Sequence, residues 1–168
     1  MLREFSAGGA VLRHMDGRWW LAAIEPQTAD DPAPRRVRRT VLALPKGLVD
    51  PGEKPDQTAV REVHEETGVH ATLVAKLKDI KYFYVRSWGD GQRVFKVVSF
   101  YLLLYRAGQL GDITPAMRRE VQAARWLPLE EAPAQLAYPG EREVAAAALA
   151  YIRAHPELEK EHAADTPR

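Results

Sequence analysis

The segment of residues 47–69 carries an unusual concentration of glutamates: Glu53, Glu62, Glu65 and Glu66, with Arg61 among them. Residues three and four positions apart share one face of a helix, so the last three carboxylates would lie together, and Arg61 can pair with Glu65 four positions later. Like charges at this spacing repel each other by about 0.2–0.5 kcal/mol per pair, which one arginine does not offset. A solvated acidic helix face is the plain alternative. Oxygen ligands arranged in this way can instead hold Mg²⁺ or Mn²⁺ against a phosphate group.

The loop before these glutamates is suited to contact with a phosphate. The run 44–53 contains two prolines and two glycines, which fix turns in the backbone. Lys46 offers a positive charge to a phosphate, and Gly47 leaves its carbonyl accessible to a metal ion. A helix is predicted over Pro55–Thr67, because proline suits a first helical position and Gly68 suits a left-handed C-terminal cap. Loop and helix together indicate a metal-and-phosphate site.

The whole segment resembles the Nudix box, G-x5-E-x7-R-E-U-x-E-E-x-G-U with U aliphatic, at every specified position. The matching residues are Gly47, Glu53, Arg61, Glu62, Val63, Glu65, Glu66, Gly68 and Val69. The resemblance implies hydrolysis of a nucleoside diphosphate linked to another group X, in which water attacks a phosphorus of a phosphoanhydride. It also implies that divalent ions, Mg²⁺ or Mn²⁺, neutralise the phosphate oxygens and orient the water.

The family pattern assigns roles to individual residues of the box. The expected metal ligands are the carbonyl of Gly47 and the carboxylates of Glu62, Glu65 and Glu66, with Arg61 as the residue that orients the glutamates. The general base is expected to be Glu65 or Glu66. Glu120, in a later loop, is either that base or an additional ligand, and a solvated loop charge is an equal alternative there.

Composition indicates one compact domain. A chain of 168 residues is long enough to bury a core, and its formal net charge of +1 gives no bulk attraction to DNA or to an anionic membrane. The chain has no cysteine, which excludes disulfides and thiolate metal sites. No apolar run is long enough to span a bilayer, and the N-terminus has no apolar signal region. We therefore expect a cytoplasmic protein, monomeric or homodimeric, that acts on a small molecule.

Alternating patterns along the chain predict mixed α/β structure. Strands are expected at residues 7–13, 19–24, 40–44, 71–77, 80–86, 94–105 and 126–128, and an alanine-rich helix at 141–155. The family resemblance implies their packing, an α/β/α sandwich with a mixed β-sheet between helices. Residues 1–155 form this single Nudix domain, and the polar tail 156–168 is expected to fray.

Residues outside the box bear on the substrate. The runs 44–47, 126–132 and 136–139 resemble the branch of the family that cleaves diadenosine polyphosphates. The expected substrate-binding residues are Lys46 and Arg39 for the phosphates, with Tyr84 and Tyr138 near the nucleotide. Solvated charges and aromatic rings packed for stability are the plain alternatives for these positions.

Other functions remain open from the sequence. Oxidised nucleoside triphosphates, ADP-ribose, diphosphoinositol polyphosphates and capped RNA are further substrates of such enzymes. A different class is a non-catalytic Nudix domain that senses a nucleotide and regulates a partner. Such domains usually lose glutamates of the box, so the intact box favours a hydrolase.

Overall fold

The computed structural model describes residues 1–27, 40–87 and 89–165. Its centre is a six-stranded sheet in the order β4-β5-β1-β2-β6, with the short β3 paired to β1. The strands are β1 (Leu2–Met15), β2 (Arg18–Pro26), β3 (Lys46–Leu48), β4 (His70–Val85), β5 (Arg93–Ala107) and β6 (Val121–Pro128). β1 and β5 are parallel, while the other pairs are antiparallel, so the expected mixed sheet is confirmed.

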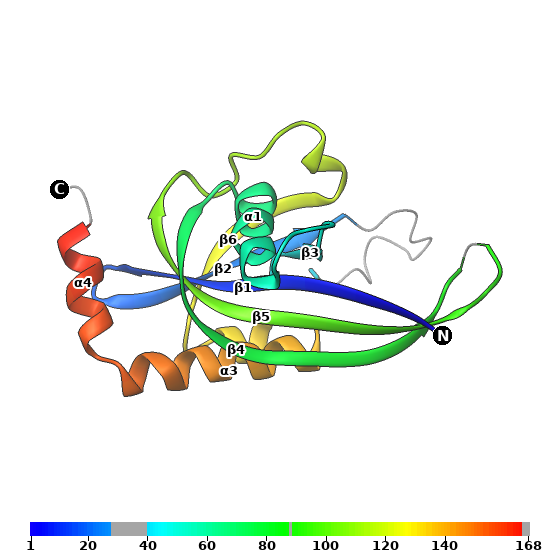
Figure 1. Cartoon of the computed structure of the whole chain (residues 1–168). Helices are drawn as coiled ribbons and strands as arrows, with labels where there is room; N and C mark the ends of the chain where they lie inside the picture. Colours follow the sequence, from blue (N-terminus) through cyan, green and yellow to red (C-terminus); the bar gives the residue numbers. More distant parts are fainter. Residues whose placement is uncertain (28–39, 88, 166–168) are drawn as a thin grey trace.

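Helices cover both faces of the sheet, as Figure 1 shows. They are α1 (Pro55–Thr67), α2 (Ala132–Gln135), α3 (Pro139–Ala154) and α4 (Glu157–Asp165). On one face, Val63 of α1 packs into a cluster with Val11 and Leu103. On the other face, α3 packs Val144 and Ala148 into the larger core. The α/β/α sandwich is therefore confirmed. None of the helices in the described part of the chain is long and apolar enough to cross a membrane.

The helix that carries the glutamates has the predicted bounds. Pro55 occupies its first turn, and Gly68 closes it with a φ of 82°, donating its N–H to the carbonyl of His64 at 2.9 Å. Along the helix, Val63 and Thr67 face the sheet and are buried, whereas Val60 is 36% exposed.

Two strands differ from their predicted form. Residues 40–44 form no regular strand, because only Ala43 bridges to Ile24, and the paired strand begins at Lys46 after Pro45. The two strands predicted at 71–77 and 80–86 are one continuous strand, β4, whose register with β5 shifts at three places. Such irregularities let one long strand follow a twisted sheet.

The end of the chain is also different from its expected form. Residues 157–165 form the helix α4, and Leu158 is buried in the main core at 9% exposure. His14 of β1 lies 3.4 Å from the carboxylate of Glu159, between Nε2 and Oε1. Although most residues of this tail are polar, Leu158 packs into the core and holds the tail against the sheet.

Candidate active site

Two glutamates of the box are buried against the loop that precedes α1. Glu62 and Glu66 are only 8% and 5% exposed. Oε1 of Glu66 accepts a hydrogen bond from the backbone N–H of Lys46 at 3.2 Å. The α-carbon of Gly47 lies so close to Glu62 that a Cβ at this position would overlap the carboxylate. The β3 segment and α1 thus bring Lys46, Gly47 and the two acids into one place.

Arg61 connects the acidic residues to one another. Its Nε lies 2.8 Å from Oε2 of Glu53, and its Nη1 lies 2.8 Å from Oε1 of Glu62 and 3.1 Å from Oε2 of Glu65. Nη2 also donates to the carbonyl of Leu48 at 3.0 Å. The predicted pairing with Glu65 is present, and the pairing with Glu53 is an addition. A planar guanidinium with several donors can fix these carboxylates at once.

The surroundings shift the acidity of these carboxyl groups in opposite directions. Burial raises the pKa of Glu66 to about 8, with the nearby Glu62 and Glu120 adding to the effect. Burial also raises the pKa of Glu62, against the opposing effect of Arg61. Hydrogen bonds from Arg61 and Thr58 lower the pKa of Glu53 to about 2. Without a cation the site therefore disfavours the ionised forms of Glu62 and Glu66, whereas Arg61 keeps Glu53 ionised.

The donor atoms at this position fit a hard divalent cation. The carboxylate of Glu62 lies next to the backbone of Gly47 and that of Glu66 next to the backbone N–H of Lys46, and oxygen is the ligand that Mg²⁺ and Mn²⁺ prefer. The buried carboxylates repel each other, and a cation would relieve that repulsion. Within the described ranges, however, no three His, Asp or Glu side chains already form a group able to hold a metal ion. Arg61 instead forms ion pairs with one oxygen of Glu62 and one oxygen of Glu65.

Glu120 lies within electrostatic reach of the same acids. It is exposed and follows the short 3-10 turn Met117–Arg119. Its charge contributes to the raised pKa of both Glu62 and Glu66. The structure thus brings Glu120 near the box, as its predicted role requires, and its exact function stays a prediction.

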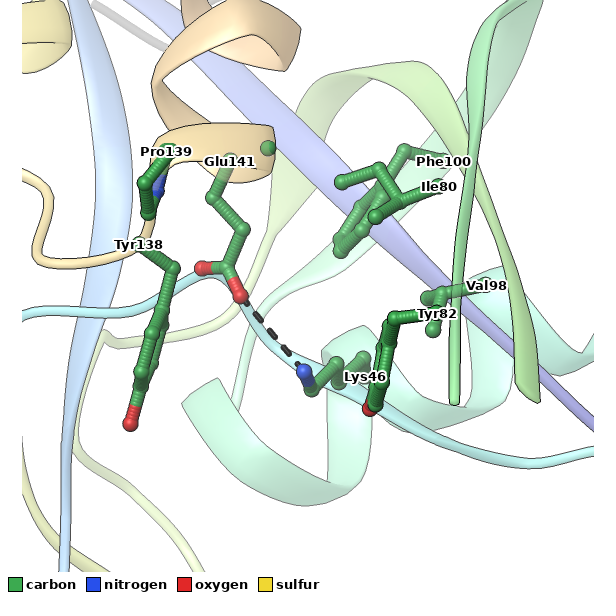
Figure 2. Close-up of a pocket in the computed structure, with 9 residues that line it drawn as sticks. Lys46, Ile80, Tyr82, Val98, Phe100, Tyr138, Pro139 and Glu141 are labelled. Atoms are coloured by element: carbon green, nitrogen blue, oxygen red, sulfur yellow. Dashed lines mark ion pairs between the residues drawn. The ribbon is translucent and has the colours of Figure 1, made fainter. Parts of the chain in front are cut away.

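A cavity of about 430 Å³ adjoins Lys46 on the α3 side of the sheet. Tyr82 and Tyr138 stand on its two sides with Lys46 between them, as Figure 2 shows. Nζ of Lys46 lies 5.8 Å from the ring centre of Tyr138 and 3.5 Å from Oε2 of Glu141. Of the predicted substrate residues, Lys46 and Tyr138 therefore share one cavity.

Glu141 was not predicted as a site residue. It is 2% exposed, lines the cavity, and accepts a hydrogen bond from the N–H of Leu44 at 2.5 Å. Burial raises the pKa of its carboxyl group, against the opposing effects of Leu44 and Lys46. From the sequence, Glu141 looks like a solvent-exposed acid in the first turn of a helix. Its partners, Leu44 and Lys46, lie about a hundred positions earlier in the chain.

The other two predicted substrate residues are not placed at this cavity. The hydroxyl of Tyr84 donates to Oε2 of Glu4 at 2.8 Å, and the ring does not line the cavity, which its neighbour Tyr82 does. Because side chains alternate along a strand, Tyr82 and Tyr84 share a face of β4, with ring centres 6.3 Å apart. Of the two rings, Tyr82 is the one that lines the cavity. Arg39 lies outside the described residues.

Comparison with known proteins agrees with this geometry. The chain is 38% identical over 148 residues to the putative mutator protein MutT4 of Mycobacterium tuberculosis, covering 86% of this chain and 54% of the relative. It is 38% identical over 90 residues to the asymmetrical bis(5'-nucleosyl)-tetraphosphatase of Rattus norvegicus, covering 52% of this chain and 56% of the relative. The chain thus spans about half the length of these relatives.

A solved structure has the same fold. The C. elegans Ap4A hydrolase binary complex superposes with a TM-score of 0.63 at 22% identity, covering 90% of this chain and 98% of that one. The model of the NUDIX domain matches residues 6–148, a range that contains both the glutamate helix and the Lys46 cavity. With its box intact and its helices on both faces of a mixed sheet, the chain belongs to the NUDIX domain family.

Proposed function

We propose that this chain is a hydrolase, dependent on Mg²⁺ or Mn²⁺, of a phosphoanhydride bond in a nucleoside diphosphate linked to X, with a diadenosine polyphosphate as its substrate. The observation that carries the proposal is the burial of Glu62 and Glu66 against the backbone of Lys46 and Gly47. Lys46 is common to this acidic cluster and to the neighbouring cavity. A polyphosphate can therefore lie across the acids while its nucleoside occupies the cavity.

The residues of the cluster divide the chemical work. The carbonyl of Gly47 and the carboxylates of Glu62, Glu65 and Glu66 would hold the divalent ion, which supplies neutralisation of the phosphate oxygens when bound. Arg61 holds Glu62 and Glu65 in position through its Nη1. Glu65 is the better placed of the two candidate bases, since it is partly exposed while Glu66 is buried. It would accept the proton of the attacking water.

The cavity supports a nucleotide substrate. Two tyrosine rings border it, and aromatic faces stack on nucleobases of any sequence. Lys46 points its ammonium group into the space between them, where a phosphate next to the nucleoside would lie. The relative from Rattus norvegicus is named for the asymmetrical cleavage of bis(5'-nucleosyl) tetraphosphates, which supports a dinucleoside polyphosphate.

A second candidate is an oxidised nucleoside triphosphate. It is favoured by the similarity, 34% identical over 138 residues, to a protein of Mycolicibacterium smegmatis that is named 8-oxo-(d)GTP phosphatase. The same cavity would then hold one modified base, and no second nucleoside would be needed. The products separate the two candidates.

The decisive experiment is a substrate panel with Mg²⁺ and product identification by mass spectrometry. Diadenosine tetraphosphate and hexaphosphate are compared with 8-oxo-dGTP, ADP-ribose and unmodified nucleoside triphosphates. We expect the tetraphosphate to give ATP and AMP, and ¹⁸O from labelled water to enter one of them only. Turnover of 8-oxo-dGTP alone would select the second candidate. Tight binding with no turnover of any phosphoanhydride would select a non-catalytic sensor.

The role of the buried acids is tested by Glu66→Gln. This variant keeps the size of the side chain but removes the charge, so we expect an intact fold and a kcat lower by two or more orders of magnitude, about the loss seen when a principal electrostatic group is removed. Glu130→Gln is the matched control, since Glu130 is exposed. Equal kcat values for the two variants would exclude Glu66 from the catalytic site.

A further inference from the structure

A second cavity, of about 550 Å³, opens on the face of the sheet that α1 covers. It lies between the ends of β1, β5 and β6 and the loop after β5, and we call it the Arg13 cavity. It shares no residue with the box or with the Lys46 cavity: its lining is Arg13, Tyr105, Gly108, Gln109, Leu110, Ala124, Arg125 and Trp126. Its size falls within the range of small-molecule sites.

Arg13 is held in the cavity by aromatic rings, and within the described part of the chain it forms no ion pair with an acid. Its guanidinium carbon lies 3.9 Å from the ring centre of Tyr105 and 5.9 Å from that of Trp126. The two rings themselves meet edge to face, with centres 6.0 Å apart. Nε of Arg13 is buried and has no hydrogen-bond partner among the described residues. A buried donor without a partner is costly, so an acceptor is expected at this position.

The lining of the cavity carries positive charge only. No aspartate or glutamate of the described ranges is among the lining residues. The second arginine, Arg125, is already paired with Glu25 of β2. Gln109 adds an amide that can donate to an oxygen. Arg13 is therefore the cationic partner that the cavity offers to an oxyanion, and no carboxylate of the described ranges lines the cavity itself.

We propose that the Arg13 cavity is a second ligand site, which binds the phosphate group of a small molecule. Guanidinium donates two parallel hydrogen bonds to a phosphate, and the stacking on Tyr105 fixes its plane before the ligand arrives. Tyr105 and Trp126 give the rim of the cavity flat apolar surface, which suits a phosphate attached to a ring system. The ligand is therefore free phosphate or a nucleoside monophosphate, and its binding requires no divalent ion.

The test measures ligand binding to the intact chain in the presence of EDTA, which removes metal-bridged binding at the box. Inorganic phosphate, AMP, adenosine and acetate are titrated by calorimetry and by thermal shift at constant ionic strength. We expect phosphate and AMP to bind wild type, and Arg13→Gln to weaken both by about tenfold or more, since a charge-assisted bidentate contact is lost. Tighter binding of AMP than of phosphate identifies a nucleotide as the ligand, and equal binding identifies phosphate.

Arg18→Gln is the matched control. Arg18 also stacks on an indole, 5.2 Å from the ring centre of Trp20, but it does not line the Arg13 cavity. This variant should bind phosphate as wild type does. Arg13→Lys keeps the charge but not the bidentate fork, so it should weaken binding several-fold even if Arg13→Gln folds poorly.

Three outcomes would overturn the proposal. These are the absence of phosphate binding to wild type, unchanged binding in Arg13→Gln or Arg13→Lys, and acetate binding as tight as phosphate binding. Because none of these measurements involves turnover, they are independent of the proposed hydrolase activity.

Discussion

Gly47 shows how one missing side chain can shape the acidic cluster. Its backbone packs directly against the carboxylate of Glu62, in space that any Cβ would occupy. Lys46, one residue earlier, donates its backbone N–H to Glu66. Two successive backbone units of β3 therefore fix the positions of both buried acids. Glycine is needed here because the backbone and the Glu62 carboxylate approach closely, and not because of its backbone conformation, since its φ is not positive.

Gly47→Ala should consequently damage activity more than stability. The added methyl group must push Glu62 away, so we expect kcat to fall by about tenfold or more, with a stability loss of about 1–3 kcal/mol from overpacking. Steady-state kinetics and thermal unfolding measure the two effects. Gly17→Ala serves as the control: Gly17 has a φ of 75° and open space around it, so only backbone strain results. An unchanged kcat in Gly47→Ala would show that this contact does not set the position of Glu62.

The limits of sequence reasoning are visible at single residues. Arg61 and Glu65 were paired correctly because helical spacing alone brings them together. Glu141 was missed because its hydrogen bond to Leu44 joins residues 97 positions apart, and no local pattern marks such a contact. The sequence could not distinguish Tyr84, which was predicted, from Tyr82, because the two share a face of β4 and only Tyr82 lines the cavity.

At the scale of elements, locally encoded features were predicted well. The bounds of α1 follow from Pro55 and Gly68, which act on their own turns of the helix. The strand predicted at 40–44 does not form, because β1 pairs with Lys46–Leu48 instead. Which segment pairs with β1 depends on the partner strand and not on the local pattern of residues. The long β4 was divided in two because its irregular register with β5 interrupts the alternation of side chains.

Asp79 links β4 to β5, the two longest strands, just after the last of the three register shifts between them. Asp79 of β4 accepts a hydrogen bond from the hydroxyl of Ser99 on β5 at 2.6 Å and from Nζ of Lys76 at 3.0 Å. The bond from Ser99, with help from Lys76, lowers the pKa of Asp79 below its usual value. The ionised form therefore stabilises the folded chain at pH values above the unfolded pKa. This contribution is lost as the pH falls through the folded pKa.

Asp79→Asn should lower the free energy of unfolding at pH 7 by about 0.5–1 kcal/mol, a modest value because the group is partly exposed. The difference from wild type should shrink as the pH falls below about 4, where the wild-type carboxyl also begins to lose its charge. Urea unfolding at a series of pH values measures this. Asp112→Asn, at an exposed position, should show no such dependence. A difference that stays constant down to pH 2 would contradict the assignment.

At the scale of the whole molecule, the first strand and the last helix pack on one core. β1 lies in the middle of the sheet, and α4 returns to it, where Leu158 joins the main apolar cluster. In Figure 1, α4 stands at the end of the sheet remote from the tip of the β4–β5 hairpin. Composition favoured a frayed tail because most of residues 157–165 are charged or small. Burial of Leu158 contributes about 1.5–3 kcal/mol toward holding this segment on the core, and a composition count does not register a single buried residue.

Leu158→Ala tests whether the tail is an integral part of the fold. We expect a loss of about 2–3 kcal/mol in unfolding free energy, because the residue leaves a space in the core, and a fall in Tm of about 5–10 °C. kcat should not change, since neither the box nor the Lys46 cavity is lined by α4. Leu73→Ala is the control, because Leu73 is 40% exposed on β4 and should cost less than about 1 kcal/mol. Equal losses in the two variants would mean that α4 is detached from the core in solution, and the domain would then end at α3.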